Sequence, residues 1–213
     1  MNEEQNNAGV KTRLVELLTS TKREGVKDLI KAMISWGFFE APASGGNHCF
    51  KTGGLAEHTL NVVTTALNIS EKLLTKEEQK EMRNSIIISA VLHDLGKCGQ
   101  FGKKMYVVNM VQDGRPTKAN PEQKYKQSEK KPFKTNPDLL PVDHAVRSIV
   151  LATLYIDLTE DEQFAIRYHD GLYERANYAV ADHETPLYLI LHYADLWSSR
   201  IIEGSNKEES EEK

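Results

Sequence analysis

The chain of 213 residues is 39% hydrophobic and 27% charged, a composition typical of globular proteins and unlike that of disordered or membrane proteins. No apolar run approaches the roughly 18 residues that span a bilayer, and the N-terminus lacks a signal-peptide pattern, so we expect a cytoplasmic protein without membrane contact. Two cysteines, Cys49 and Cys98, exclude a disulfide scaffold and a four-cysteine zinc site, and we expect both to be reduced thiols.

The net charge of −4 gives no general attraction to nucleic acid, so we expect no stable nucleic-acid complex. The charge is unevenly spread along the chain. Residues 112–138 contain seven Lys or Arg and four Asp or Glu, which gives this segment +3 and the remainder −7. The segment is therefore a candidate for attracting phosphate groups.

Residues 10–202 are expected to form a single helical domain between two flexible polar ends, residues 1–9 and 203–213. Residues 11–36 predict one or two short helices. In residues 55–74, apolar side chains recur every three or four positions, which predicts an amphipathic helix. His58 falls on the apolar face of that helix.

The next predicted helix begins at Thr75, where Glu78 completes a capping box, and runs through Met82 into the block IIISAVLHDLG. Its second half is apolar on every side, which is typical of a helix at the centre of a bundle. Gly96 is expected to end it.

Residues 105–125 differ from this helical pattern. The β-branched stretch MYVVNMV is followed by the turn signal QDGRP and by lysine-rich polar sequence, which predicts a small hairpin or flap. The predicted fold class is therefore all-α, a helical bundle with a short basic, hairpin-like insertion near residues 105–130.

Three more helices are predicted after the insertion. The first spans residues 143–155, and the second spans residues 159–169, where Thr159 and Glu162 form a capping box. The last begins with Thr185 as N-cap and Pro186 at its first position. Asp195 interrupts the apolar stripe of this last helix.

The pair His93-Asp94 closes the most apolar helix of the chain. Polar groups there need partners, because desolvating a charge without compensation is costly. A hydrogen-bonded helix cap is one solution, and a metal ion is another, since imidazole and carboxylate suit zinc, manganese and iron. His58, His169 and Asp195 are likewise polar residues at positions of three other helices where an apolar residue or a simple helix end would be expected. We therefore expect four helices to direct ligands to one interior point, as in the metal sites of helical bundles.

The ordered motif of these residues, in the segments GGLAEHTLNVV, AVLHDLGK and LHYADLWSSR, resembles the HD superfamily of metal-dependent phosphohydrolases. The resemblance covers residues 53–202 and is strongest for small stand-alone members, although GGL-x-EHT also resembles the motif of single-strand exoribonucleases. It implies an HD-type helical domain with four core metal ligands, His58, His93, Asp94 and Asp195. Two further histidines match the added ligands of members that hold two metals, His144 in LPVDHAVRS and His169 in AIRYHDG.

The resemblance implies one or two divalent ions, for which manganese, iron, magnesium, cobalt and nickel are all compatible with the ligand types. Asp94 is the expected bridge between two metals. One metal is expected among His58, His93 and Asp195, and the other beside His144 and His169. Metal-bound water would then attack a phosphoester.

Lys97 lies one turn beyond His93 and is expected to take part in catalysis by pairing with a substrate phosphate oxygen. The alternative is a surface lysine that complements the helix C-terminus. Arg147 and Arg167 are further candidates for substrate binding.

Other residues near the motifs have less specific expected roles. His192 is expected to be a satisfied core histidine that supports the ligands, and Glu57 to orient a ligand or to have no catalytic part. His48 and Cys49 are expected in a plain loop, and the sequence assigns no role to Cys98.

The leading functional hypothesis is a metal-dependent phosphohydrolase that cleaves a phosphomonoester or phosphoanhydride of a small nucleotide. A second hypothesis keeps the chemistry and changes the substrate to a cyclic nucleotide or single-stranded nucleic acid, on account of the basic segment. A third is a metal-stabilised binding module without catalysis, against which Lys97 argues, because a structural metal site needs no phosphate-facing cation.

Overall fold

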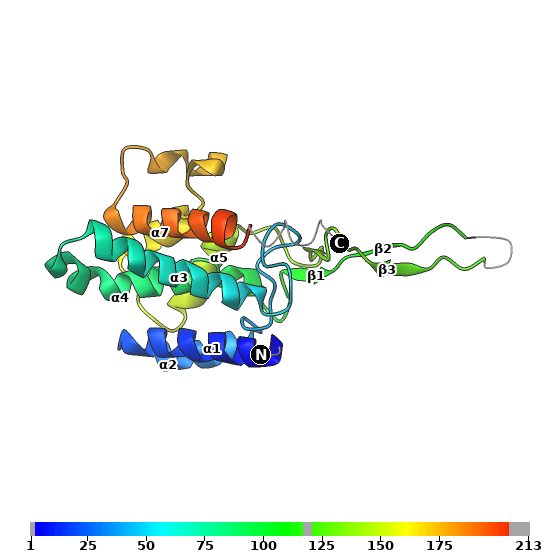
Figure 1. Cartoon of the computed structure of the whole chain (residues 1–213), viewed down its shortest axis with the longest axis horizontal. Coiled ribbons are helices and arrows are strands. Elements are labelled where there is room, and N and C mark those ends of the chain that lie inside the picture. Colours follow the sequence, from blue (N-terminus) through cyan, green and yellow to red (C-terminus); the bar gives the residue numbers. More distant parts are fainter. Residues whose placement is uncertain (1–2, 117–120, 205–213) are drawn as a thin grey trace.

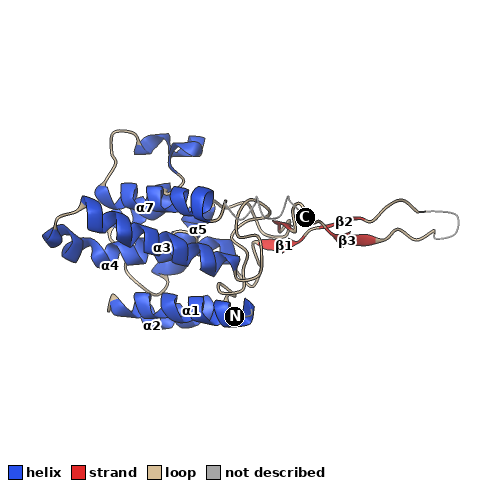
Figure 2. Ribbon diagram, in the orientation of Figure 1, coloured by secondary structure: helices blue, strands red, loops and turns tan. Residues whose placement is uncertain are grey.

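The computed structural model describes residues 3–116 and 121–204, and within them seven α-helices form a bundle from which a β-ribbon projects (Figures 1 and 2). The α-helices are α1 (Glu3–Ser20), α2 (Val26–Ser35), α3 (Gly54–Leu73), α4 (Lys76–Leu92), α5 (His144–Thr153), α6 (Glu160–Tyr168) and α7 (Pro186–Trp197). Shorter elements are the 3-10 helices η1 (Leu95–Cys98), η2 (Gly171–Tyr173) and η3 (Arg175–Val180) and the π-helical turn η4 (Ser198–Ile202). The predicted helical fold class is confirmed.

Helix α4 is the central element of the bundle and contacts α1, α3, α5, α6 and α7. Ile86, Ile87 and Ile88 are all buried although consecutive helical residues point in different directions. Such burial on every side requires neighbours all around, as the apolar sequence predicted. The predicted capping box is formed, because Thr75 Oγ1 accepts from the Glu78 N–H and the Glu78 carboxylate accepts from the Thr75 N–H.

Helices α1 and α2 lie along one side of the bundle, where α1 packs against α3 and α4 (Figure 1). Arg23, in the turn between them, fixes this layer to α6. Its guanidinium donates to both oxygens of the buried Glu162 carboxylate, at 2.6 and 3.0 Å, and to the Asp157 carbonyl. A two-pronged contact of this kind is a strong and geometrically specific interaction.

The basic insertion is an antiparallel ribbon. Strand β1 (Tyr106–Val108) pairs with β4 (Phe133–Thr135), and β2 (Met110–Gln112) pairs with β3 (Tyr125–Gln127). Strands β2 and β3 project from one end of the bundle (Figure 1). The predicted hairpin is confirmed, and its return strand continues past residue 130 to Thr135.

Both ends of the fold differ from the expected flexible segments. Helix α1 begins at Glu3, so residues 3–9 continue the first helix instead of preceding it. Glu203, which was expected in the polar tail, is only 5% exposed, and its carboxylate accepts a hydrogen bond from the buried His58. Residues 205–213 of the expected tail lie outside the described residues. None of the described helices combines the length and hydropathy needed to cross a bilayer.

Candidate metal centre

All six predicted ligand residues meet around the Asp94 carboxylate. Its Oδ2 lies 3.5 Å from His58 Nε2 and 3.4 Å from His93 Nε2. Its Oδ1 lies 3.3 Å from His144 Nε2 and 3.7 Å from His169 Nε2. Thus two different pairs of imidazoles face the two oxygens of one carboxylate. The sixth residue, Asp195, has Oδ1 at 3.2 Å from His58 Nε2 and within 4.8 Å of ligand atoms of His93 and His169.

Five helices contribute these side chains, and they do so mainly from helix ends. His93 and His169 are the C-cap residues of α4 and α6, and His144 is the first residue of α5. His58 and Asp195 lie within α3 and α7, which pack against each other. The six side chains can converge because α4 contacts each of the other four helices, α3, α5, α6 and α7.

Backbone carbonyls fix the tautomers of two histidines. His93 Nδ1 donates to the Ala90 carbonyl at 2.8 Å, and His169 Nδ1 donates to the Ile166 carbonyl at 2.8 Å. A carbonyl only accepts, so the proton sits on Nδ1 and the lone pair of Nε2 faces the cluster. In both cases the acceptor is three residues back in the helix that the histidine caps. This arrangement holds Nε2 ready to bind a cation.

Three buried atoms of the cluster have no hydrogen-bond partner among the described residues, namely His58 Nε2, His93 Nε2 and Asp94 Oδ1. Buried polar atoms without partners are rare in native proteins, and each calls for an explanation such as an ion. Imidazole nitrogens and carboxylate oxygens are suitable donors for divalent transition metals. The residues present therefore fit a metal site. Two groups of three side chains that could each hold an ion share Asp94: one contains His58 and His93, and the other contains His144 and His169.

The charges of the cluster favour ionised carboxylates. Burial alone would raise the pKa of Asp94, but Lys97 and His93 hold it well below its usual range. Burial likewise opposes ionisation of Asp195, yet the neighbouring His58 keeps the pKa of Asp195 below its usual value. Burial and the charge of Lys97 lower the pKa of His144 to about 4, so its imidazole is neutral at pH 7, the form that binds metals.

Lys97 is bound to the cluster. Its Nζ lies 2.6 Å from Asp94 Oδ2, and its side chain is 14% exposed. This contact raises the pKa of Lys97 despite burial, so the lysine stays charged. The expected partner was a substrate phosphate, whereas the structure pairs the lysine with Asp94 and leaves its ammonium beside the centre.

Glu203 is the site residue that sequence reasoning missed. Its carboxylate accepts from Nδ1 of His58, with oxygens at 3.0 and 3.1 Å, from Nδ1 of His48 at 2.6 Å, and from Nδ2 of Asn61 at 3.0 Å. Burial opposes its ionisation, yet these partners hold the pKa of Glu203 below its usual range. Burial also opposes the charge of His58, but Asp195 and Glu203 raise the pKa of His58 to about 10, so a cation bound at Nε2 would displace a proton from this imidazole.

The two arginines expected to bind substrate have other partners. Arg147 is buried, and its guanidinium donates to the Leu140 carbonyl at 3.0 Å. Arg167 donates to Asn177 Oδ1 at 2.9 Å and lies over the ring of Tyr168. These contacts give both arginines a part in holding the chain around the site.

The remaining expectations concern residues around the cluster. His192 Nδ1 donates to the His169 carbonyl at 2.7 Å, so this histidine is satisfied, as expected. Glu57 pairs with Lys51 at 2.7 Å. Cys49 and Cys98 are both free, and burial raises the pKa of the Cys98 thiol to about 12.

Asp170, which follows the ligand-like His169, also lies beside the cluster. One of its oxygens is 3.5 Å from His144 Nε2 and the other is 3.8 Å from His169 Nε2. Its side chain is 41% exposed, so the His144 side of the cluster is the more open one.

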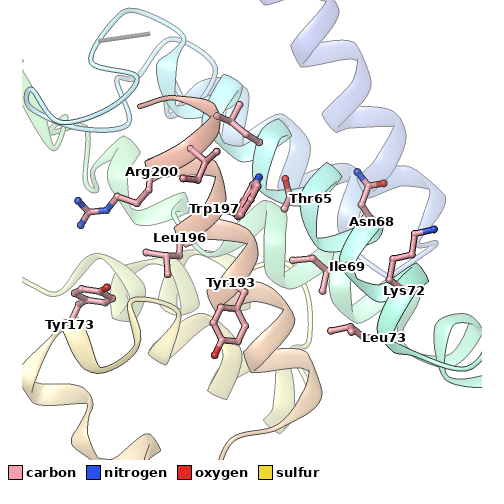
Figure 3. A pocket seen from close by; sticks show the side chains of 12 residues that line it. Thr65, Asn68, Ile69, Lys72, Leu73, Tyr173, Tyr193, Leu196, Trp197 and Arg200 are labelled. Atoms are coloured by element: carbon pink, nitrogen blue, oxygen red, sulfur yellow. The ribbon is translucent and has the colours of Figure 1, made fainter. Parts of the chain in front are cut away.

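A separate, open apolar groove of about 1010 Å³ lies between α3 and α7 (Figure 3). Tyr193, Trp197, Ile69 and Leu73 are among its lining residues, which include none of the six cluster residues. A smaller cavity of about 350 Å³ includes Lys97 in its lining and therefore adjoins the cluster.

Comparison with known protein families identifies the part of the chain that contains the six cluster residues. A family model described as HD domain matches residues 55–196, two thirds of the chain. The chain belongs to the HD domain family. HD domains bind divalent metals and define a superfamily of metal-dependent phosphohydrolases, so the resemblance in the motifs is confirmed. No curated protein and no solved structure matches the chain significantly.

Proposed function

We propose that this HD domain is a divalent-metal phosphohydrolase that cleaves a phosphomonoester or phosphoanhydride of a small nucleotide. One cation would be held by His58, His93, Asp195 and Oδ2 of Asp94, and a second by His144, His169 and Oδ1 of Asp94. The observation that carries the proposal is the division of four imidazoles between the two oxygens of Asp94.

Cations bound there would lower the pKa of coordinated water toward about 7 and neutralise charge on phosphoryl oxygens. The protein's own groups have three tasks. The carbonyls of Ala90 and Ile166 orient His93 and His169. Lys97 holds Oδ2 of Asp94 and adds a positive charge where an anionic phosphate would approach. Burial of His58 and Asp94 limits competing contacts with bulk water.

The test is a substrate panel containing nucleoside mono- and triphosphates, cyclic nucleotides and a labelled single-stranded oligonucleotide. The proposal predicts metal-dependent release of phosphate or pyrophosphate from a mononucleotide, abolished by chelation. Asp94→Asn is expected to lower the rate by about 100-fold, since it removes the negative charge and replaces one of the two shared oxygens with an amide group that cannot bind a cation. Asp113→Asn, on the exposed ribbon, is the matched control and should leave the rate unchanged. Turnover that survives chelation, or metal-dependent folding without turnover of any substrate, would contradict the proposal.

A phosphodiester substrate is the second candidate, and the ribbon favours it. Five cations of the ribbon are exposed and form no ion pair within the described part of the chain. They are Arg115, Lys124, Lys130, Lys131 and Lys134. Exposed cations on a projecting ribbon suit a phosphate backbone. In the same panel, shortening of the oligonucleotide or opening of a cyclic nucleotide at a higher rate than mononucleotide hydrolysis would favour this candidate.

A further inference from the structure

The cavity of about 350 Å³ next to Lys97 has aromatic walls. Trp36, at the end of α2, lines it together with Tyr106 of β1 and Phe133 of β4. In the antiparallel register, Tyr106 pairs with Thr135 and Val108 pairs with Phe133, so Tyr106 and Phe133 lie on one face of the ribbon. The base of the ribbon thus places two rings in a cavity whose remaining lining comes from the end of α2, the loop that follows it, η1 and the loop before β1.

The cavity adjoins the metal centre. Lys97 lines it, and the same lysine contacts Asp94 Oδ2 at 2.6 Å. Tyr106 lies close enough to Lys97 and Asp94 for both charges to affect the pKa of its phenol. Burial and Asp94 raise this pKa, whereas Lys97 lowers it. A ligand in this cavity would therefore lie beside the groups that face the phosphate.

The lining fits a flat, partly apolar ligand. The rings of Trp36, Tyr106 and Phe133 are half-buried, whereas Glu40 and Lys104 are exposed at the rim. Specific small-molecule sites combine apolar and aromatic walls with a few polar groups, in cavities of about 300–1,000 Å³. Aromatic side chains stack on nucleobases of any sequence. A bare sugar phosphate has no flat apolar face to place against such walls.

We propose that this aromatic cavity binds the nucleobase of a nucleoside phosphate whose phosphate group reaches the metal centre. The inference rests on the proposed function for the position of the phosphate, and it assigns the base-binding surface to the ribbon base and the end of α2. It gives the ribbon a part in substrate selection in addition to any contact with phosphates.

Tryptophan fluorescence of the full-length protein tests this directly. The chain has two tryptophans, and Trp197→Phe leaves Trp36 as the single reporter, since Trp197 lines the separate groove. Adenosine 5′-monophosphate and adenosine, titrated in the presence of Mg²⁺, are expected to quench Trp36, whereas ribose 5-phosphate is not. Tyr106→Ala in this background is expected to weaken nucleoside binding about 10-fold, since base stacking on one ring supplies affinity of this order.

Tyr125→Ala is the matched control, because Tyr125 lies on the same ribbon, is 58% exposed and is outside the cavity lining. Phe133→Leu provides a second variant that keeps an apolar side chain while removing a ring, and circular dichroism checks that each variant folds. Equal quenching by ribose 5-phosphate and adenosine, or equal losses for Tyr106→Ala and Tyr125→Ala, would overturn the inference.

A parallel assay with para-nitrophenyl phosphate separates this inference from the proposed function. Metal-dependent hydrolysis without nucleoside quenching would overturn base binding and leave the phosphohydrolase intact. Specific quenching by nucleosides without hydrolysis of any phosphoester would support the base site and contradict the phosphohydrolase.

Discussion

Replacing Glu203 by glutamine tests whether this carboxylate supports the metal centre. The carboxylate accepts from Nδ1 of His58, Nδ1 of His48 and Nδ2 of Asn61 while only 5% exposed. A glutamine amide keeps one acceptor oxygen and presents an N–H₂ group to at least one of these donors. A hydrogen bond to a charged group contributes about 1.5–3 kcal/mol, and loss of a group that orients a metal-binding histidine typically costs about 10- to 100-fold in metal affinity.

Isothermal titration of the chelated protein with Mn²⁺ gives the measurement. Glu203→Gln is expected to weaken binding by at least about 10-fold. His48→Ala should bind Mn²⁺ much as the unmodified protein does, because the contact between Glu203 and His58 remains. Glu71→Gln on the exposed face of α3 controls for a simple change of charge. Unchanged Mn²⁺ affinity in a folded Glu203→Gln protein would refute the argument that Glu203 positions His58.

Three further predictions concern stability and reactivity. Chelation is expected to lower the melting temperature and re-addition of Mn²⁺ to restore it, because a ligand of the native state stabilises that state; an unchanged melting curve would contradict this. In urea denaturation, Arg23→Met should lose about 3 kcal/mol, since it strands the buried Glu162 carboxylate, whereas the exposed Arg13→Met should lose almost nothing. Burial raises the thiol pKa values of Cys49 and Cys98, the latter to about 12, so at pH 8 both stay protonated and should react with a disulfide reagent only after unfolding; rapid native labelling would contradict this.

The starts of α4, α6 and α7 were predictable because the signals that form them are local. The capping boxes of Thr75 with Glu78 and of Thr159 with Glu162 are both present, and Thr185 accepts from the Tyr188 N–H as N-cap. Each contact spans three residues, so a short segment of sequence contains all the information needed.

The convergence of the six cluster residues was predictable from polar residues that interrupt apolar helices, together with the family motif. The family resemblance implied that the imidazoles would divide between two sides of Asp94, whereas the oxygen that each pair faces depends on how five helices cross. Likewise, the pairing of Lys97 with Asp94 follows from their i, i+3 spacing, but sequence alone does not decide between that carboxylate and a phosphate.

Glu203 was missed for two physical reasons. It lies 145 residues from His58 and begins a stretch whose composition is that of a polar tail. Its direction also depends on the π-helical turn at 198–202, where the Glu203 N–H donates to the Ser198 carbonyl five residues back. Such a turn shifts the following side chain relative to the α-helical register, and π-turns are rare enough that a sequence pattern does not predict them.

Whether Asp94 joins two cation sites can be seen by anomalous diffraction at the manganese edge from crystals grown with Mn²⁺. We expect one anomalous peak among His58, His93, Asp195 and Oδ2 of Asp94, and a second among His144, His169 and Oδ1. Manganese bound only elsewhere on the chain, with neither oxygen of Asp94 in contact with an ion, would contradict this expectation.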